Sequence, residues 1–303
     1  MLMVTVPGAA AYATHRYRQA VRQLDALPAR PPALPGVVQS LETGWGRISY
    51  RAIERPGSPH PPIVLVHGWG RTADSAWWPV MIDSDRTIIA IDLPGHGRSI
   101  LDRPFTFSLA AESIVTAIAD AGLDRPLLAG HSMGGPACLT AILWAGGQAF
   151  SGFVAIATSA FWVRPRQSVL VASAPYLLGT RSPVTLRNHA TELRRAGPGE
   201  SARISWEYAV RPSRAVMLES ALELRRFDAR RWRNFDRPPT TWVVTGHDAI
   251  IDRAAQRASA RMFSDHSIEL AAEHSVVIDD PFEVRRILEA VATQPDRPAL
   301  MAV

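Results

Sequence analysis

Short apolar runs recur along the chain at positions 62–66, 87–91, 126–129, 152–157 and 240–245. They are rich in Ile, Val, Leu and Ala, and glycine, proline or polar residues lie close to their ends. Runs of this length and composition predict β-strands buried on both faces, because a half-exposed strand would alternate apolar and polar positions. Several of the segments between them carry apolar residues at helical spacing instead. The pattern therefore predicts strands and helices that follow one another along the chain.

Weaker patterns predict further elements. Residues 37–54 alternate as expected for a β-hairpin whose turn lies at 43–46. Residues 107–122 show helical periodicity, with Ser108 as the expected N-cap and Gly122 as the stop. The remaining expected elements are helices over 74–80, 136–146 and 252–263, a strand over 267–271, and a last helix that begins at Asp280-Pro281 with Asp280 as its N-cap.

Residues 9–27 predict a separate N-terminal helix that stops at Pro28. An apolar stripe runs along it at helical spacing, and arginines lie off the stripe. We expect this helix to pack on the domain; a basic amphipathic helix resting on a membrane surface is the alternative. The proline-rich residues 30–36 predict a stiff linker. Because the chain start does not match a secretory signal and no apolar stretch is long enough to span a bilayer, we expect a cytoplasmic or membrane-peripheral protein.

Residues 159–237 show a helical pattern interrupted by proline and glycine. From position 160 to 237 the sequence has 15 Arg and 7 acidic residues, a net charge of +8 in a chain whose formal charge is +5. No nucleic-acid-binding motif accompanies these arginines, so they favour solvated helix faces or contact with anionic lipid, and we expect no nucleic-acid partner. The chain of 303 residues is long enough for one large domain with this segment inserted.

The sequence Gly-His-Ser-Met-Gly at 130–134 lies between a predicted strand and a predicted helix. A Gly-x-Ser-x-Gly motif in this context predicts a sharp, strained turn that lifts the hydroxyl of Ser132 clear of a sheet. Gly130 and Gly134 would leave room for the turn, and Gly135 would allow a neighbouring strand to approach closely. The N-terminus of the following helix would favour negative charge beside the serine.

Two further segments extend this motif into a family pattern. His-Gly-Trp-Gly at 67–70 follows the strand expected at 62–66, and Asp-Leu-Pro-Gly-His-Gly-Arg-Ser at 92–99 follows the strand expected at 87–91. Together with the serine motif, in this order and spacing, they resemble the α/β-hydrolase fold over about residues 37–291.

The resemblance implies an α/β fold with a mostly parallel central sheet flanked by helices. A helical cap would be inserted after the strand near 152–158. The domains would then be an N-terminal helix and linker at 1–36, a core made of 37–158 and 238–303, and a cap at 159–237.

A serine hydroxyl is a poor nucleophile at neutral pH, so it needs a base, and the base needs an orienting carboxylate. In this fold the three follow one another in the order nucleophile, acid, histidine. Asp248 follows the strand expected at 240–245 and resembles the family's acid, while Asp252 competes with it. Asp252 stands at the start of a predicted helix, where an N-cap is its natural role. The alternative acid position, 158–162, carries no carboxylate.

The base is expected in a loop after the last strand, where His274 stands. His266 precedes that strand and is expected at the surface. His131, His96 and His67 lie in loops that resemble those of the family, and we expect structural roles for them, with His67 holding its loop together.

An acyl-transfer enzyme also needs preorganised N–H donors for the tetrahedral oxyanion. By the resemblance, these are the backbone amides of Trp69 and Met133. In the cap, apolar and aromatic side chains are expected to bind the substrate: Phe161, Trp162, Tyr176, Leu177, Trp206 and Met217.

The sequence thus predicts a serine esterase or lipase that acts on a small-molecule ester or a lipid. Serine-dependent C–C hydrolases, cofactor-free haloperoxidases and lyases keep the same three residues and remain alternatives, and a non-catalytic binding protein is the alternative from another class. Neither a nucleotide-binding loop nor a metal-binding cluster is evident, so neither cofactor nor metal is expected. The sequence leaves the oligomeric state open.

Overall fold

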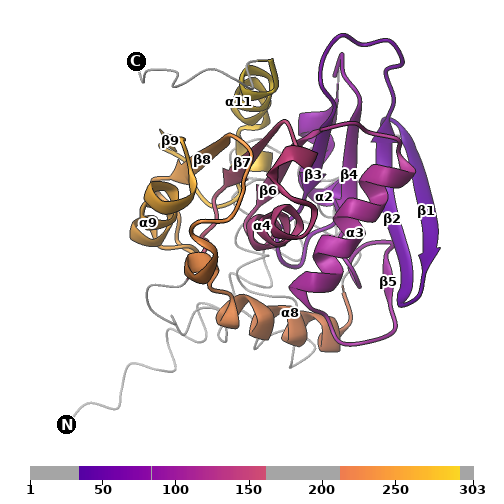
Figure 1. Cartoon of the computed structure of the whole chain (residues 1–303), viewed down its shortest axis with the longest axis horizontal. Helices are drawn as coiled ribbons and strands as arrows, with labels where there is room; N and C mark the ends of the chain where they lie inside the picture. The colour runs from indigo at the N-terminus through magenta and orange to yellow at the C-terminus, as the bar shows by residue number, and fades with distance from the viewer. Residues whose placement is uncertain (1–33, 83, 162–211, 294–303) are drawn as a thin grey trace, which may run out of the picture.

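The computed structural model describes residues 34–82, 84–161 and 212–293. The predicted N-terminal helix, most of the linker and the greater part of the predicted cap lie outside these residues. Within the described chain, the centre is a nine-stranded sheet in the order β1-β2-β4-β3-β6-β7-β8-β9, with β5 paired to β2. Figure 1 shows this sheet with helices on both of its faces.

The sheet is antiparallel at one edge and parallel from β4 to β9. The predicted hairpin forms β1 and β2, which pair antiparallel, and β2 then pairs antiparallel with β4. Every neighbouring pair from β4 through β3, β6, β7 and β8 to β9 is parallel. The expected mostly parallel sheet is therefore confirmed. The strands are β1 Val37–Thr43, β2 Gly46–Ile53, β3 Ile63–Val66, β4 Ile88–Asp92, β5 Ile100–Leu101, β6 Leu127–His131, β7 Gly152–Ile156, β8 Thr240–Thr245 and β9 His266–Leu270.

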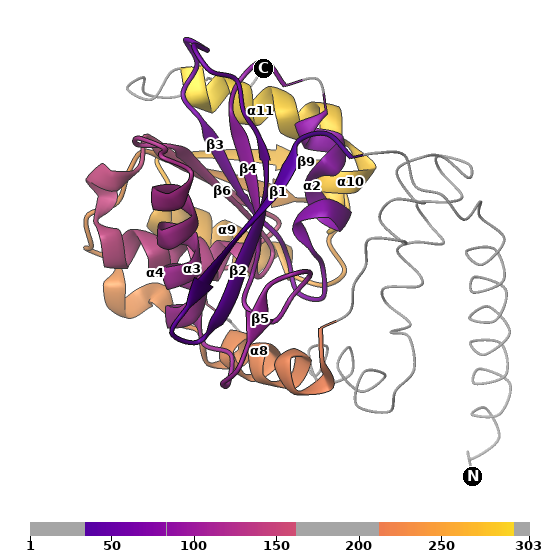
Figure 2. The ribbon, with the colours of Figure 1, turned by 90° about the vertical axis from the view of Figure 1, so that its right-hand side faces the viewer.

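Two helical layers cover the sheet and bury separate apolar cores. Helices α3 (Phe107–Asp120), α4 (Gly134–Ala145) and α9 (Arg253–Phe263) share one core with one face of the strands. Helices α2 (Ala73–Met81), α10 (Val276–Asp279) and α11 (Pro281–Thr293) share the other. Figure 2 shows the two layers on opposite sides of the sheet. Every residue is buried in β3, β4, β6, β7 and β8, as the unbroken apolar runs predicted.

Three local predictions needed correction or addition. Ser108 is not the N-cap of α3, because Thr106 has the extended backbone of a cap and its hydroxyl accepts a hydrogen bond from Leu109 N at 3.2 Å. Strand β5 and helix α10 were not predicted, because elements of two and four residues are too short to show a period. His266 is the first residue of β9 rather than a residue before it.

The described end of the predicted cap contains helix α8 (Arg214–Arg226), which Figure 1 and Figure 2 show across one end of the sheet, and a 3-10 helix at Ala229–Trp232. Helix α8 contacts loops that follow β3, β4 and β5. The indole of Trp69 donates to Ser220 Oγ at 3.0 Å, and Glu219 Oε2 accepts from Phe105 N at 2.9 Å. A Cβ placed on Gly95 would lie 2.7 Å from Cγ2 of Val216, so this loop packs tightly on the helix.

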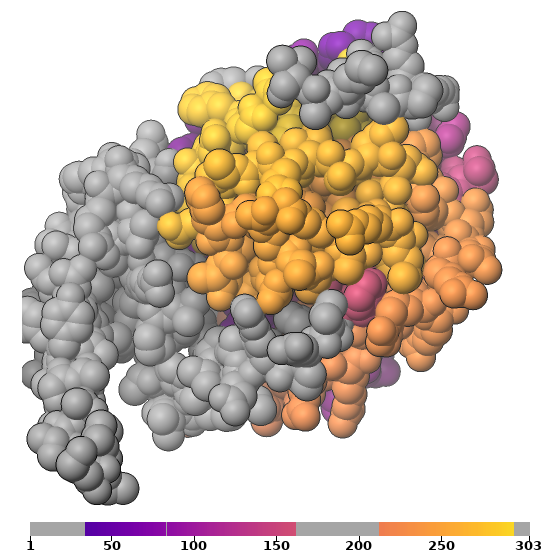
Figure 3. Space-filling view, turned by 90° about the vertical axis from the view of Figure 1, so that its left-hand side faces the viewer, coloured from indigo at the N-terminus to yellow at the C-terminus, as the bar shows by residue number. Residues whose placement is uncertain are grey.

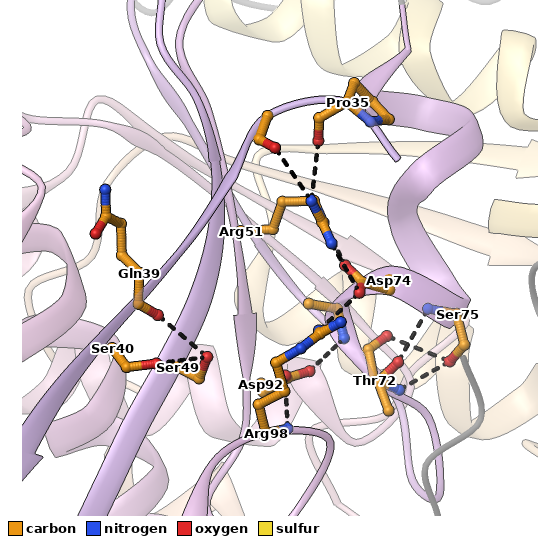
Figure 4. A network of polar contacts seen from close by, with 12 residues as sticks. Pro35, Gln39, Ser40, Ser49, Arg51, Thr72, Asp74, Ser75, Asp92 and Arg98 are labelled. Carbon is orange, nitrogen blue, oxygen red and sulfur yellow. Dashed lines mark hydrogen bonds and ion pairs between the residues drawn. The ribbon is translucent and has the colours of Figure 1, made fainter. Parts of the chain in front are cut away.

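A buried ion network lies beneath the start of α2 (Figure 4). Asp74 is 1% exposed and accepts from Arg51 at 2.5 and 3.1 Å and from Arg98 at 2.7 Å. Burial alone would raise the pKa of Asp74, but the two guanidinium groups outweigh it and hold the pKa below its ordinary value. Asp92 accepts from the amides of Ala73 and Arg98 at 2.7 and 2.9 Å. The network therefore joins β2, β4 and the first turn of α2.

Removing Asp74 should destabilise the fold strongly. Asp74→Ala would leave the guanidinium of Arg51 buried without its carboxylate, which typically costs about 3–5 kcal/mol of unfolding free energy. Glu283→Ala, which removes the partner of the exposed Arg286, should cost less than about 1 kcal/mol. Urea denaturation of both variants measures the difference, and equal losses would show that the network contributes no more than a surface pair.

Candidate active site

Ser132 stands on the turn between β6 and α4 with a φ of +52°, a conformation that is rare for residues other than glycine. Two contacts to the neighbouring strand β7 and its extension hold the turn. Ser132 N donates to Ile156 O at 2.9 Å, and Thr158 Oγ1 donates to Ser132 O at 2.7 Å. The strained turn expected from the sequence is therefore present, and its backbone is fixed from the side of β7.

The glycines around Ser132 have no space for a side chain. A Cβ on Gly130 would lie 2.5 Å from Gly134 O, and one on Gly134 would lie 2.3 Å from Val66 O. A Cβ on Gly135 would lie 2.4 Å from Thr158 Oγ1, which follows β7. The predicted roles of these glycines are confirmed, because each close contact is to an adjacent part of the turn or the sheet.

The structure brings Ser132, His274 and Asp248 into one hydrogen-bonded chain. His274 Nε2 lies 3.0 Å from Ser132 Oγ, and His274 Nδ1 lies 2.8 Å from Asp248 Oδ2. An ionised carboxylate only accepts, so Nδ1 carries the proton and Nε2 is left to accept from the serine hydroxyl. Asp248 comes from the loop after β8 and His274 from the loop after β9. These loops belong to the C-terminal third of the chain, coloured orange and yellow, which forms most of the described surface in Figure 3.

Asp248 is held by donors on both of its oxygens. Oδ1 accepts from the amides of Ile250 and Ile251, both at 2.8 Å. Oδ2 accepts from Thr245 Oγ1 at 2.8 Å and from Gln256 Nε2 at 2.9 Å, besides His274. Burial alone would raise the pKa of Asp248, but His274 and the amide donors outweigh it and lower the pKa below its ordinary value. The group therefore stays a carboxylate beside the imidazole.

Asp252 has the other role that the sequence predicted for it. It is the N-cap of α9, and its Oδ1 accepts from Ala254 N at 2.8 Å. Of the two candidate acids, Asp248 and Asp252, it is Asp248 that hydrogen-bonds to His274.

Three other histidines lie in the loops around Ser132, His274 and Asp248, and burial lowers the pKa of each. His131 Nε2 donates to His274 O at 2.8 Å, and burial and the neighbouring His274 lower the pKa of His131 to about 3. His67 Nδ1 donates to Gly68 O at 2.8 Å, while its Nε2 accepts from Leu93 N at 3.0 Å. Burial lowers the pKa of His96 to about 4. All three rings are neutral at pH 7, and the structural role predicted for His67 is confirmed.

The residues proposed to stabilise an oxyanion flank the serine. Met133 is the N-cap of α4, and its side chain makes no capping hydrogen bond. A Cβ on Gly68 would lie 3.0 Å from Ser132 Cβ, which places the loop carrying Trp69 against Ser132. The indole of Trp69 points to α8, where it donates to Met217 O at 3.3 Å as well as to Ser220. The N-terminus of α4 and the loop that carries Trp69 therefore both lie next to Ser132.

Two of the predicted cap residues can be located. Phe161 is 5% exposed, forms a bridge with Asp228 and lies under the guanidinium of Arg230, 5.0 Å from its ring centroid. Met217 on α8 is 1% exposed. The remaining four, Trp162, Tyr176, Leu177 and Trp206, lie outside the described residues.

The polar residues that support these groups were not predicted from the sequence. Thr158, Thr245, Gln256 and the backbone contact of His131 hold the serine turn, the aspartate and the histidine loop. One signal for Gln256 is present in the sequence, because it lies between Ala255 and Ser259-Ala260 on the buried face of α9. A polar residue on the apolar face of an amphipathic helix indicates a buried hydrogen-bond partner.

A model of the alpha/beta hydrolase family matches residues 63–287, so the chain belongs to this family. It is 37% identical over 105 residues to the dihydrolipoyllysine-residue acetyltransferase component of the acetoin cleaving system of Pseudomonas putida, covering 33% of this chain and 27% of that protein. It is 33% identical over 105 residues to the pimeloyl-[acyl-carrier protein] methyl ester esterase of Edwardsiella ictaluri, covering 34% and 38%. The chain thus spans less than half the length of either relative.

A solved structure of similar fold is the enol-lactonase of Burkholderia xenovorans, with a TM-score of 0.70 at 18% identity, covering 84% of this chain and all of the lactonase chain.

In the part of the chain that the structure describes, no helix is long and apolar enough to cross a membrane. Within the same residues, no group of three or more His, Cys, Asp or Glu could hold a metal ion.

A methyl group at Gly134 should disturb the serine turn. Gly134→Ala would place a Cβ 2.3 Å from a backbone oxygen of β3, which cannot move without shifting the strand, so we expect a loss of about 1–3 kcal/mol in unfolding free energy. The control is Gly44→Ala, because no atom lies within 4 Å of a Cβ there, and it should change stability by less than about 0.5 kcal/mol. Thermal and urea unfolding measure the stability of both variants. If Gly134→Ala were as stable as Gly44→Ala, the close contact between position 134 and β3 would be contradicted.

Proposed function

We propose that the protein is a serine hydrolase that cleaves carboxylic esters through an acyl-enzyme on Ser132. The observation that carries the proposal is the hydrogen-bonded chain from Ser132 through His274 to Asp248, with distances of 3.0 and 2.8 Å. In a family whose members share this fold, such a chain is the arrangement that makes a serine nucleophilic.

The first half of the reaction transfers the acyl group. His274 Nε2 accepts the proton of Ser132 Oγ as the oxygen attacks the acyl carbon of the ester. The amides of Met133 and Trp69 donate to the oxyanion of the tetrahedral intermediate. Asp248 stays ionised and stabilises the imidazolium that forms. The intermediate collapses when His274 returns the proton to the departing alcohol, which leaves the acyl group on Ser132.

The second half repeats these steps with water. His274 removes a proton from water, whose oxygen attacks the acyl carbon, and the same amides stabilise the second oxyanion. The proton then returns to Ser132 Oγ, and the carboxylic acid leaves. The steps balance without a metal or an organic cofactor, and we propose that neither takes part.

Ser132, His274 and Asp248 could also serve reactions other than ester hydrolysis. The names of similar proteins favour ester hydrolysis. One relative is a methyl ester esterase and a structural neighbour is an enol-lactonase, so both names refer to attack on an ester carbonyl. The C–C hydrolase, haloperoxidase and lyase alternatives remain to be tested with their own substrates. A binding protein without activity is distinguished by a fluorophosphonate probe, which labels an activated serine.

Replacement of Ser132, Asp248 and Asp252 should separate effects on chemistry from effects on folding. Ser132→Ala should lower kcat by on the order of 10⁶, because the nucleophile is lost. Asp248→Asn should lower it by about 10⁴, because an amide favours the wrong tautomer of His274. Asp252→Ala should lose about 1 kcal/mol of stability as an N-cap and keep kcat within a few-fold. Ester turnover and thermal unfolding measure both effects; near-wild-type turnover by Ser132→Ala would exclude this mechanism.

We propose further that residues 159–237 form a cap that binds the acyl chain. In support, Met217 is buried on α8, and α8 contacts the loop of Trp69 beside the serine. An apolar pocket gains about 0.8 kcal/mol for each buried methylene, so hexanoyl esters should have a higher kcat/KM than acetyl esters. A panel of p-nitrophenyl esters of graded length measures this preference. Equal kcat/KM for the two esters would argue against an apolar acyl site.

The location and the partners proposed from the sequence rest on segments that the structure does not describe. Contact with a membrane through the N-terminal helix or the cap, and a cytoplasmic or membrane-peripheral location, stay predictions.

A further inference from the structure

Gln256 is a fully buried residue of α9 whose side-chain amide reaches across to β8 and to the loop that follows it. Its Oε1 accepts from Thr245 N at 3.0 Å, at the end of β8. Its Nε2 donates to Asp248 Oδ2 at 2.9 Å and to Ile251 O at 3.1 Å. One side chain therefore contacts the strand end, the carboxylate and the far end of the loop.

The orientation of this amide is fixed by the chemistry of its neighbours. The backbone N–H of Thr245 can only donate, so the oxygen of Gln256 must face it. The carboxylate of Asp248 and the carbonyl of Ile251 can only accept, so the nitrogen must face them. A rotation of the amide by 180° would break all three contacts and bring like groups together. Gln256 is thus a rigid donor aimed at Oδ2.

The donors around Asp248 leave one direction for the imidazole. Oδ1 is occupied by two loop amides, and Oδ2 receives Thr245 Oγ1 and Gln256 Nε2 before it meets His274 Nδ1. The two side-chain donors to Oδ2 come from β8 and α9, which pack against each other as regular elements. The loop itself exposes His247 and Ala249 to solvent. The loop amides alone would therefore leave the carboxylate less firmly placed.

We propose that Gln256 is a positioning residue for catalysis, which orients Asp248 toward His274 and does not contact the substrate. This role rests on the proposed function, because it acts through the pair that activates Ser132. Loss of the Gln256 amide should lower the rate of acyl transfer and leave substrate binding nearly unchanged.

The test combines two variants of Gln256 with a control on the same helix. Gln256→Met keeps the length of the side chain and removes the donor, so kcat should fall about 10-fold to 100-fold, as when outer hydrogen-bond partners of active-site groups are removed, with KM within about two-fold. Phe263→Leu loosens the packing of the same helix without touching Asp248, and its kcat should stay within a few-fold. The readouts are hydrolysis of p-nitrophenyl butyrate and the rate of labelling by a fluorophosphonate probe, measured over a range of pH.

Gln256→Glu has nearly the same shape and remains informative where Gln256→Met fails to fold. While the new carboxyl is protonated, it can donate to Asp248 Oδ2 as the amide does. When it ionises, it can no longer donate and it repels Asp248. The pH profile of kcat/KM should therefore gain a descending limb on the alkaline side that the wild-type protein lacks. Thermal unfolding of Gln256→Glu at the same pH values separates this effect from a loss of stability, because a structural role alone would not produce the limb while the protein stays folded.

The outcomes separate this proposal from the proposed function. Variants of Gln256 with wild-type rates at every pH, beside an active wild-type protein, would overturn the positioning role alone. So would an equal loss of kcat in Phe263→Leu, since the stability of α9 would then explain the effect. A wild-type protein that neither hydrolyses the ester nor reacts with the probe would overturn the proposed function, and the role of Gln256 with it.

Discussion

The close approach of β3, β6 and β7 at the serine turn is the constraint on which the rest of the site depends. Ser132 has a positive φ, and its flanking glycines lie where a Cβ would meet the backbone of the turn, the end of β3 or the side chain of Thr158. The turn is tight because β6 pairs in parallel with both β3 and β7, so the three strand ends meet at one edge. Strain of this kind persists where surrounding structure over-determines it. Here the contacts from Ile156 O and Thr158 to Ser132 supply that support.

Parallel pairing also explains how residues far apart in sequence form one chain of hydrogen bonds. The carboxyl ends of β6, β8 and β9 lie at the same edge of the sheet, so the loops that follow them converge. Ser132, Asp248 and His274 each come from one of these loops. His247 N donates to Ala272 O at 3.0 Å, and His131 donates to the carbonyl of His274, so the loops are tied to one another as well as to their strands.

The histidines beside Ser132 are neutral, whereas the polar network beneath the start of α2 is ionised. Beside Ser132, the histidines His67, His96 and His131 are buried and neutral, so they supply hydrogen bonds without adding charge. Farther away, Asp74 is ionised and compensated by Arg51 and Arg98, and this network anchors the helix that follows the loop of Trp69. The carboxylate of Asp248 hydrogen-bonds to His274 and can therefore stabilise a positive charge on its ring. In the proposed mechanism, the imidazolium of His274 would therefore have its counter-ion in a fixed position.

The sequence by itself determined the strands other than β5, the hairpin, the serine turn with its glycines and the N-cap role of Asp252. These features depend on local periods, on turn stereochemistry and on caps, which neighbouring residues encode. The order of Ser132, Asp248 and His274 could be predicted because the family resemblance supplied it. Only the tertiary structure decided which carboxylate faces His274, that Gln256 and Thr245 hold it, that Thr106 rather than Ser108 caps α3, and how Arg51 and Arg98 meet Asp74. Each of these depends on atoms brought together by strand pairing and helix packing, and no local pattern records which distant polar groups will meet once water is excluded.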